Sequence, residues 1–303
     1  MENGIPFPDI SPEIFSVNVF GMELALRWYA LGYIVGIVIG WWIIRRAIAT
    51  ARLWRDGRAP MNRTQLEDLL TWIVLGVIIG GRLGFVLFYQ PAYYFANPLQ
   101  IPQIWTGGMS FHGGFIGVIV AVWLFPRRHG LPTAQVADLM AIAAPAAIFL
   151  VRIANFINNE LWGKPSTLPW AVIFPGPAAQ NCPGYPSPCA RHPSQLYEAL
   201  LEGALLGTVL LVLAWKRGWL KRPGLLTGSF FLGYGLARYF VEFFRQADAQ
   251  FISPDNPMGY TLRIGAWGVS QGQLLSLPMI AVGIAVLVWA SRRAAPGPGN
   301  DTA

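Results

Sequence analysis

The amino-acid sequence predicts an all-α polytopic membrane protein with seven transmembrane helices. Of its 303 residues, 54% are hydrophobic and only 12% are charged, which is about half the charged share usual in soluble domains. The hydrophobic residues gather in stretches of about 20, the length that crosses the hydrocarbon core of a bilayer. This composition excludes a soluble domain, a disordered chain and a small disulfide scaffold.

The expected spans are separated by shorter segments and form a single transmembrane domain over residues 1–293. Their approximate bounds are 24–44, 68–88, 110–126, 134–157, 195–215, 224–244 and 272–291. Several contain glycines at four-residue spacing, at Gly36/Gly40, Gly76/Gly80, Gly113/Gly117 and Gly203/Gly207. Small residues at this spacing allow two helices to approach closely, so these glycines are expected at helix–helix contacts.

Basic residues decide the expected orientation, because cytoplasmic loops of membrane proteins are enriched in Lys and Arg. Fourteen of the 22 basic residues follow the first, third, fifth or seventh span: Arg45, Arg46, Arg52, Arg55, Arg58, Arg63, Arg127, Arg128, Lys216, Arg217, Lys221, Arg222, Arg292 and Arg293. The N-terminus is therefore expected outside and the C-terminus inside. The net charge of +7 then reflects membrane insertion. No nucleic-acid partner is expected, since no basic domain lies outside the spans.

The segments on the outer side differ in composition from the cytoplasmic ones. Residues 89–109 combine Tyr, Trp and Pro, which is typical of an interfacial arm at headgroup level. Residues 158–194 are rich in Pro and Gly and are expected to form a small cap. Cys182 and Cys189 lie in this cap, on the oxidising side, where either a short disulfide or two free thiols fits. Residues 294–303 are expected to be a disordered cytoplasmic tail.

Eight basic residues do not fit the topology signal, and four of them are arginines within the spans or at their outer edge. Arg82, Arg152 and Arg238 lie within apolar spans, and Arg245 lies at the outer edge of the sixth. A charge at membrane depth costs about 2.5–3.5 kcal/mol on insertion scales, so such residues are functional candidates. Counted along their helices, all four lie in the outer half of the bilayer. Several guanidiniums at one depth indicate an anion there, and a lipid phosphate is the obvious one.

The sixth span carries polar side chains along one helical face. Tyr234, Arg238, Glu242 and Arg245 follow a spacing of three or four residues, which places all of them on that face. The simpler interpretation is an internal salt bridge between Arg238 and Glu242 that only cancels its own charge. That interpretation leaves Arg245 and the arginines of the other spans unexplained.

The fourth span ends in a similar polar face formed by Arg152, Asn155 and Asn159. Amides and a cation at this depth need partners. Helix capping is the simpler role for Asn159, but it does not account for Arg152 or Asn155. In the fifth span, Glu198 and Glu202 share a face at the outer end.

His112 and Tyr29 are further candidates at the same level. His112 precedes two glycines at the outer start of the third span. Histidine titrates near neutral pH and can act as a general base, although a helix cap is the simpler role. Tyr29 lies about one turn into the first span and could present its hydroxyl. No Asp-x-x-Asp cluster, phosphate-binding loop or Ser-His-Asp arrangement occurs, so no metal and no cofactor are predicted.

Five motifs together resemble the bacterial prolipoprotein diacylglyceryl transferase family. They are Gly80-Gly81-Arg82, the run Gly107 to Gly114, the run Arg191 to Glu198, the run Val241 to Gln246, and the pattern Arg152, Asn155, Phe156, Asn158, Glu160 and Gly163. The resemblance covers nearly the whole chain. Val151 and Ala154 stand where the family signature has glycine, and both are backbone-packing positions.

The resemblance implies a specific reaction. Members of the family transfer the diacylglyceryl group of phosphatidylglycerol to the lipobox cysteine of a prolipoprotein signal peptide, so that a thioether forms and glycerol phosphate leaves. It implies seven spans in a bacterial inner membrane, with the active site facing the periplasmic leaflet and with arm and cap in the periplasm. The remaining alternatives are an anion transporter or channel that uses the intramembrane arginines, and a lipid-binding assembly protein without enzymatic activity.

The resemblance and the polar faces together define the expected site. The candidate catalytic residues are His112, Tyr29, Asn155, Arg238 and Glu242. The candidate substrate-binding residues are Arg152, Arg82, Glu160, Gly163, Tyr234 and Arg245. In this hypothesis Arg152 and Arg238 hold the phosphate and stabilise the leaving group, and Glu242 orients Arg238. His112 removes the proton of the incoming thiol.

Overall fold

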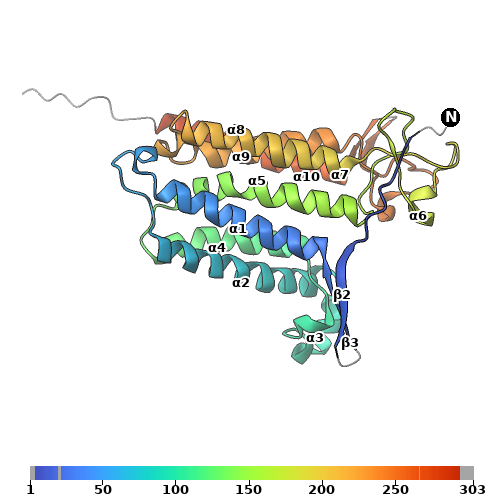
Figure 1. The fold of residues 1–303 in the computed structure, drawn as a ribbon, viewed down its shortest axis with the longest axis horizontal. Helices are drawn as coiled ribbons and strands as arrows, with labels where there is room; N and C mark the ends of the chain where they lie inside the picture. The colour runs from blue at the N-terminus through green and yellow to red at the C-terminus, as the bar shows by residue number, and fades with distance from the viewer. Residues whose placement is uncertain (1–3, 20–21, 266, 294–303) are drawn as a thin grey trace, which may run out of the picture. The chain divides into compact units, whose positions relative to one another are not determined.

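The computed structural model describes residues 4–19, 22–265 and 267–293, and most of these residues are helical (Figure 1). The longer helices are α1 (Trp28–Ile48), α2 (Arg63–Phe88), α4 (Phe111–Arg128), α5 (Thr133–Ile157), α8 (Leu206–Trp215), α9 (Leu225–Val241) and α10 (Gln271–Arg292). The shorter ones are α3 (Pro91–Ala96), α6 (Pro177–Gln180) and α7 (Ser194–Glu198). The π-helix η4 (Ala199–Leu205) joins α7 to α8, so the three form one continuous rod.

Five helical segments among the described residues are long and apolar enough to cross a membrane. They are Trp28–Ile48, Arg63–Phe88, Thr133–Ile157, Ser194–Trp215 and Gln271–Arg292. The chain is therefore a mostly helical membrane protein. The other two expected spans are also helices, α4 with 18 residues and α9 with 17. At 1.5 Å per residue α9 is about 26 Å long, somewhat short of a hydrocarbon core of about 30 Å.

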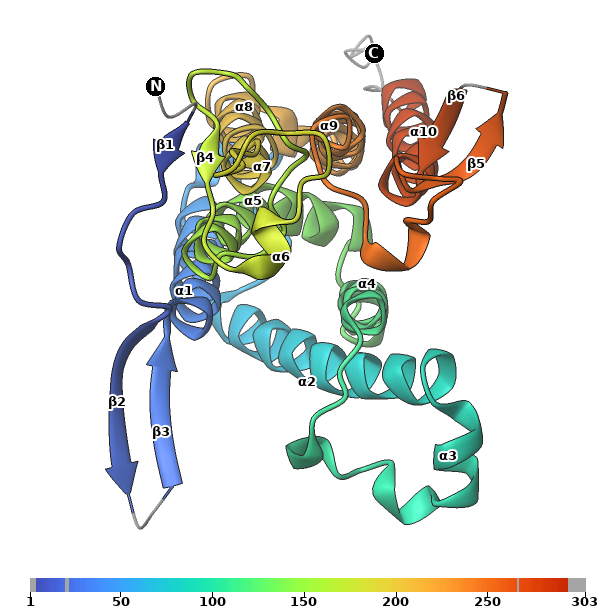
Figure 2. The same ribbon diagram turned by 90° about the vertical axis from the view of Figure 1, so that its right-hand side faces the viewer.

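The expected all-α class holds for most of the chain, but the described residues also include three two-stranded sheets that were not expected. The strands are β1 (Ile5–Pro6), β2 (Glu13–Val19), β3 (Met22–Arg27), β4 (Val172–Ile173), β5 (Tyr260–Ile264) and β6 (Trp267–Ser270). β1 pairs with β4 in parallel, while β2/β3 and β5/β6 are antiparallel hairpins (Figure 2). Because β3 runs to Arg27, the first membrane helix begins at Trp28 and not at the expected residue 24.

The chain forms two compact units, each described here by itself. Unit 1 comprises Met1–Ile43 with Met140–Ala303, and unit 2 comprises Ile44–Leu139. Within unit 1, α5, the α7–α8 rod, α9 and α10 run side by side (Figure 1). The single transmembrane domain expected over residues 1–293 stays a prediction, and the expected disordered tail, residues 294–303, lies outside the described residues.

Glycines set the helix spacing in unit 1, as their four-residue spacing predicted. A Cβ on Gly36 of α1 would lie 2.7 Å from the Cα of Ala147 on α5. A Cβ on Gly203 would lie 2.6 Å from the Cβ of Phe149, also on α5. Neither position has room for a side chain, so α5 packs closely against α1 and against the α7–α8 rod.

Unit 2 is held together by an equally close contact between α2 and α4. Gly76 and Gly80 of α2 face Gly113 and Gly117 of α4, and a Cβ on any of them would run into the opposite backbone. The first turn of each helix is capped by a polar side chain, Asn62 for α2 and Ser110 for α4. The two helices therefore pack backbone to backbone, which membrane helices favour because lipid gives no hydrophobic drive for association.

The cap, residues 158–194, has a small core of its own. Phe174 and Val172 are buried, and Phe7 and Trp162 pack against them. Cys182 and Cys189 form a disulfide with a Cα–Cα distance of 6.3 Å. Of the two alternatives for these cysteines, the structure has the disulfide and not the free thiols.

We predict that Gly117→Ala destabilises unit 2 by about 1–3 kcal/mol, the usual cost of forcing extra atoms into a packed contact. The matched control is Gly114→Ala in the same helix, where the new Cβ would lie 3.6 Å from the Val77 carbonyl oxygen, an ordinary contact. The measurement is the free energy of unfolding in detergent. Equal loss of stability in both variants would show that the α2–α4 contact is looser than described.

Candidate functional site

The candidate site is a cluster of opposite charges in unit 1, built by α5, the α7–α8 rod and α9. Arg152 lies near the end of α5, Glu198 at the end of α7 and Glu202 in η4. Arg238 lies in the last turn of α9, and Glu242 is the residue that ends it. Glu198 and Glu202 are four residues apart, as are Arg238 and Glu242. Residues at this spacing are neighbours on a helix surface, so each of these two pairs lies on one face.

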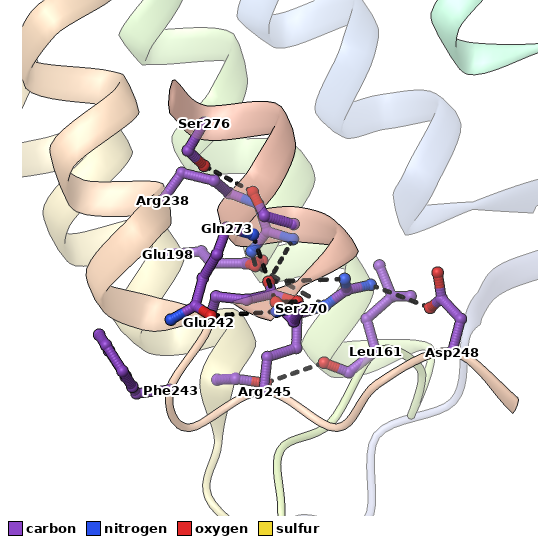
Figure 3. Close-up of polar contacts among 12 residues, drawn as sticks. Leu161, Glu198, Arg238, Glu242, Phe243, Arg245, Asp248, Ser270, Gln273 and Ser276 are labelled. Carbon is purple, nitrogen blue, oxygen red and sulfur yellow. Dashed lines mark hydrogen bonds and ion pairs between the residues drawn. The ribbon is translucent and has the colours of Figure 1, made fainter. Parts of the chain in front are cut away.

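Glu198 lies at the centre of the cluster with no side-chain exposure. Its Oε1 accepts a hydrogen bond of 2.6 Å from Nη1 of Arg238. Its Oε2 lies 3.1 Å from Nε of Arg152, and Nε of Arg245 approaches Oε1 at 4.0 Å. Figure 3 shows the side chains of Glu198, Arg238 and Arg245 together. One buried carboxylate thus joins three arginines from different parts of the chain.

The predicted ion pair between Arg238 and Glu242 is confirmed, with 2.8 Å between Nη2 and Oε2. It is not a complete account, because the same guanidinium also binds Glu198. Glu242 Oε1 accepts a hydrogen bond of 3.0 Å from the hydroxyl of Ser270, the residue that caps α10. The cluster therefore also fixes the start of α10 (Figure 3).

Arg245 follows the end of α9 and lies at the side of the cluster. Its guanidinium is 4.0 Å from Oε2 of Glu242 and 3.7 Å from Oδ1 of Asp248, which is largely exposed. These distances are longer than those of Arg238, so Arg245 is held less tightly. The structure thus brings Arg152, Arg238, Glu242 and Arg245 together as predicted.

The cluster is asymmetric in its exposure. The side chains of its three arginines are 13–18% exposed, while those of Glu198, Glu202 and Glu242 are 0–4% exposed. Three guanidiniums face three buried carboxylates, whose formal charges cancel theirs, and the exposed Asp248 adds a fourth carboxylate at the edge beside Arg245. The cations nevertheless lie toward the accessible side, which suits recognition of an anion by the two-pronged guanidinium.

Asn155, Glu160 and Gly163 form a polar turn next to the cluster. The amide of Asn155, which is buried, donates a hydrogen bond of 2.7 Å to Oε1 of Glu160. The Glu160 carbonyl accepts one from the Gln195 amide. The Gly163 N–H donates to the His192 carbonyl at 2.8 Å, and a Cβ at Gly163 would meet that carbonyl. Gly163 is therefore required for the close crossing of two chain segments.

Two tyrosines extend the site onto α1 and a third lies on α9. The hydroxyl groups of Tyr29 and Tyr33 are 3.3 Å apart. Tyr33 interacts electrostatically with Arg152 and Glu160, so it connects Tyr29 to the cluster. Tyr234, which the sequence places on the same face as Arg238 and Glu242, also lies beside Arg152. Tyr33 was not among the residues predicted for the site, although its spacing of four from Tyr29 indicates that both share a helical face.

Glu198 and Glu202 are the other residues that the sequence analysis left out of the site. Their shared face was evident from their spacing, but no feature of the sequence connected it to Arg152. The structure makes that connection through ion pairs of 3.1 Å from Glu198 and 3.6 Å from Glu202. A stricter count of charge at membrane depth would have found them, because each deep arginine needs a partner.

Arg82 has a different environment in unit 2. Its guanidinium donates hydrogen bonds to the backbone carbonyls of Ile101, Gly107 and Gln100, at 2.7, 2.5 and 2.8 Å. It also lies 5.0 Å from the centre of the Tyr94 ring. Arg82 is buried and anchors the arm, residues 89–109. The contacts of Arg82 thus hold the arm in place, and its predicted role in binding a lipid phosphate stays a prediction.

His112 also belongs to unit 2, in the first turn of α4, and its side chain is exposed. The hydroxyl of Ser110 caps this turn by accepting a hydrogen bond of 3.2 Å from the Gly113 N–H. Capping, the simpler role for His112, is therefore carried by Ser110. The role of His112 as a general base stays a prediction.

The cap contains a lysine and a histidine with altered protonation behaviour. The Lys164 ammonium donates a hydrogen bond of 2.9 Å to the Phe243 carbonyl, and its burial lowers the pKa of Lys164. Burial, together with the positive charge of Lys164, lowers the pKa of His192. A ring nitrogen of His192 lies 3.1 Å from the Tyr197 hydroxyl. Among the described residues no group of three or more His, Cys, Asp or Glu is arranged to hold a metal ion.

The helices and the cluster define a class of protein: a helical membrane protein in which deep arginines are balanced by buried glutamates. Comparisons with known proteins narrow this class. Residues 16–289 match the family model described as prolipoprotein diacylglyceryl transferase. The chain therefore belongs to the prolipoprotein diacylglyceryl transferase family, as its motifs implied.

Relatives from three bacteria carry the name phosphatidylglycerol–prolipoprotein diacylglyceryl transferase. The protein of Ruegeria pomeroyi is 62% identical over 284 residues, which cover 94% of this chain and 96% of the relative. That of Cereibacter sphaeroides is 61% identical over 290 residues, covering 96% and 99%. That of Rhizobium meliloti is 48% identical over 290 residues, covering 96% and 94%. The residues matched by the family model, 16–289, include every residue of the charge cluster.

We predict that Glu198→Gln lowers the free energy of unfolding by about 3 kcal/mol, because it leaves buried arginines without their shared counter-charge. The control is Glu67→Gln, which removes an exposed carboxylate 3.0 Å from Arg63 and should change stability by no more than about 0.5 kcal/mol. Unfolding of the purified protein in mixed detergent micelles measures both. A Glu198 variant as stable as the control would contradict the central role of this carboxylate.

We also predict that His192 makes the cap less stable in mild acid. Its pKa is lowered in the folded state, so the unfolded chain binds the proton more readily, and stability falls as the pH drops below about 6.5. Above that pH the contribution is fully present. Thermal unfolding of the wild type and of His192→Gln between neutral pH and pH 5 measures it. The variant should show the weaker pH dependence, and identical profiles would exclude the effect.

Proposed function

We propose that this protein transfers the diacylglyceryl group of phosphatidylglycerol to the lipobox cysteine of a prolipoprotein, the first step of lipoprotein maturation. In the reaction the cysteine sulfur forms a bond to the glycerol carbon, the bond from that carbon to the phosphate oxygen breaks, and glycerol phosphate leaves. The observation that carries the proposal is the identity of about 60% to relatives of that name over nearly the whole chain.

The arginines of the cluster are suited to hold the phosphate of the lipid headgroup. Arg152 and Arg238 each present a planar fork of N–H donors, which matches the geometry of phosphate oxygens. As the carbon–oxygen bond breaks, negative charge grows on the leaving phosphate. Donors already fixed at that place stabilise the growing charge without reorganising. Arg245, held less tightly, is proposed to close over the headgroup.

The neighbouring side chains keep these arginines in place. Glu242 orients Arg238 through the ion pair of 2.8 Å, and Glu198 holds both Arg238 and Arg152. Asn155 and Tyr29 are proposed to bind the glycerol hydroxyls of the headgroup, supported by Glu160. These supporting contacts matter because a small misplacement of a catalytic group slows the reaction strongly.

The cysteine must lose its proton, because the thiolate is the nucleophile. His112 is the proposed base, since imidazole titrates near neutral pH. The acyl chains stay in the lipid, so the lipid enters sideways between helices. No metal or cofactor takes part in the proposed reaction.

The proposed setting is the inner membrane of a bacterium, with α4 and α9 completing seven spans and the N-terminus outside. The arm and the cap are then periplasmic, and the site opens toward the periplasmic leaflet. Exposed apolar side chains on the arm, such as Leu99 at 84% and Trp105 at 77%, suit a position at the headgroup level. The partners are phosphatidylglycerol, the prolipoprotein signal peptide and the surrounding lipid.

We predict that Arg152→Ala lowers kcat/KM by at least about 100-fold, the usual effect of losing one donor to a developing anion. The assay combines purified protein, phosphatidylglycerol and a lipobox peptide, and mass spectrometry detects the diacylglyceryl peptide. The control Arg63→Ala removes an exposed guanidinium and should leave turnover within about twofold. Both variants should insert into the membrane like the wild type.

The same assay separates the alternatives. An anion transporter would move a small anion into liposomes and leave the peptide unmodified, and an assembly protein would bind phosphatidylglycerol without turnover. An unmodified peptide with correctly folded wild-type protein would overturn the transferase. Full activity of the Arg152 variant would overturn the role of that arginine alone.

A further inference from the structure

Glu202 is a buried carboxylate to which the proposed reaction assigns no task. Its side chain is fully buried, and the neighbouring Tyr234 hydroxyl does not reach full hydrogen-bond geometry with either carboxylate oxygen. It lies in η4 (Ala199–Leu205), the part of the rod wound as a π-helix. Such segments are rare and are frequent at functional sites. A buried carboxylate with such weak partners requires a reason.

The three buried carboxylates of the cluster differ in how firmly their negative charge is held. Glu198 contacts Arg238 at 2.6 Å and Arg152 at 3.1 Å. Glu242 contacts Arg238 at 2.8 Å and accepts a hydrogen bond from Ser270. For Glu202 the nearest cation is Nη2 of Arg152, at 3.6 Å. Glu202 is therefore the carboxylate whose charge the cluster stabilises least.

Binding of an anionic lipid disturbs the charge balance of this cluster. Among its buried side chains, three arginines and three glutamates cancel in formal charge before the lipid arrives, and the exposed Asp248 at the edge is solvated by water. A phosphodiester headgroup adds one negative charge, and an uncompensated charge in such surroundings is costly. The phosphate also competes with Glu202 for the guanidinium of Arg152. One proton on a carboxylate restores the balance, and the carboxylate that loses its partner is the one to take it.

We propose that Glu202 takes up one proton when an anionic phospholipid binds at Arg152, so that lipid binding and protonation are coupled. The proton comes from water and adds to a carboxylate oxygen of Glu202, and no bond of the lipid changes in this step. The inference rests on the proposed function, because it uses the same arginine as the phosphate ligand. Glu202 is thus a positioning residue that releases Arg152 to the substrate.

The groups that face Glu202 agree with this assignment. They are Arg152 from α5, Glu198 from α7, and Tyr234 and Arg238 from α9. Arginine does not release its proton in proteins, and a tyrosine hydroxyl is neutral near pH 7. Glu198 is held between two guanidiniums. None of these facing groups can easily change its charge, so the proton goes to Glu202. Protonation of Glu202 also removes its repulsion with Glu198.

Calorimetry of lipid binding counts the proton. The full-length wild type in detergent is titrated with short-chain phosphatidylglycerol at one pH in two buffers that differ in ionisation enthalpy. The heat difference should correspond to about one proton taken up per lipid. Between pH 7 and 9 the affinity should then fall by up to about tenfold per pH unit, the slope for one coupled proton. No proton uptake and a flat profile would overturn the inference.

Substitution assigns the proton to its residue. Glu202→Gln carries a neutral amide in the same volume, so it should bind the lipid with no proton uptake and with an affinity that no longer falls with pH. The control Glu67→Gln removes an exposed carboxylate and should keep the wild-type slope. A wild-type slope in Glu202→Gln would overturn the inference, because another group would then carry the proton.

A second measurement remains if Glu202→Gln fails to fold. The infrared difference spectrum of the wild type at pH 8 should gain the carbonyl band of a protonated carboxyl group when lipid is added, and absence of that band would overturn the inference. Peptide turnover in the same preparation separates the two proposals. Modified peptide without proton uptake sinks the role of Glu202 and leaves the transferase intact, whereas absence of lipid binding and of turnover sinks the transferase itself.

Discussion

The structure of unit 1 depends on one constraint, the neutralisation of arginine charges that are largely buried between helices. Arg152 and Arg238 lie in largely apolar helices with side chains only 18% and 14% exposed, so each guanidinium needs a carboxylate partner within the protein. Their partners come from a third helix, because Glu198 is contributed by the rod that begins at Ser194. Three helices must therefore pack together before any of these charges is satisfied. Glu242 extends the same requirement to α10 through its hydrogen bond with Ser270.

The close packing of the helices and the charge cluster support each other. Gly203 lets the rod approach α5 at Phe149, one turn from where Arg152 meets Glu198 and Glu202. A larger side chain at Gly203 would push the two helices apart and lengthen these ion pairs. The attraction within a buried ion pair weakens with distance. A longer ion pair therefore no longer offsets the free energy of removing both charges from water. Small residues in the sequence thus determine the geometry of the charged site.

Much of the fold could be predicted from hydropathy, because the bilayer imposes length and composition on every span. All seven expected segments are helices in the structure. The hairpins were missed, since β2 and β3 combine a strand with the start of an apolar run that also suits a helix, and only pairing distinguishes the two. The site was predicted in part. Its arginines could be predicted because they are charges within apolar segments. The contacts of Glu198 and Glu202 with Arg152 could not, because they join helices that are distant in the sequence. The partners of Arg82 are backbone carbonyls of the arm. They could not be predicted, because no local sequence pattern shows how the arm folds back onto α2.

The same geometry explains why the cluster uses arginine and not lysine. Arg152 lies between Glu198 and Glu202, and Arg238 lies between Glu198 and Glu242. Each guanidinium thus spans two carboxylates with different nitrogens, which the compact ammonium of lysine cannot do in one position. A cation that spans two anions can give up one of them to a phosphate and keep the other. In the proposed reaction, Arg152 leaves its weaker partner, Glu202, while Glu198 continues to hold it in place, so that one arrangement stabilises the fold and frees donors for an anionic substrate.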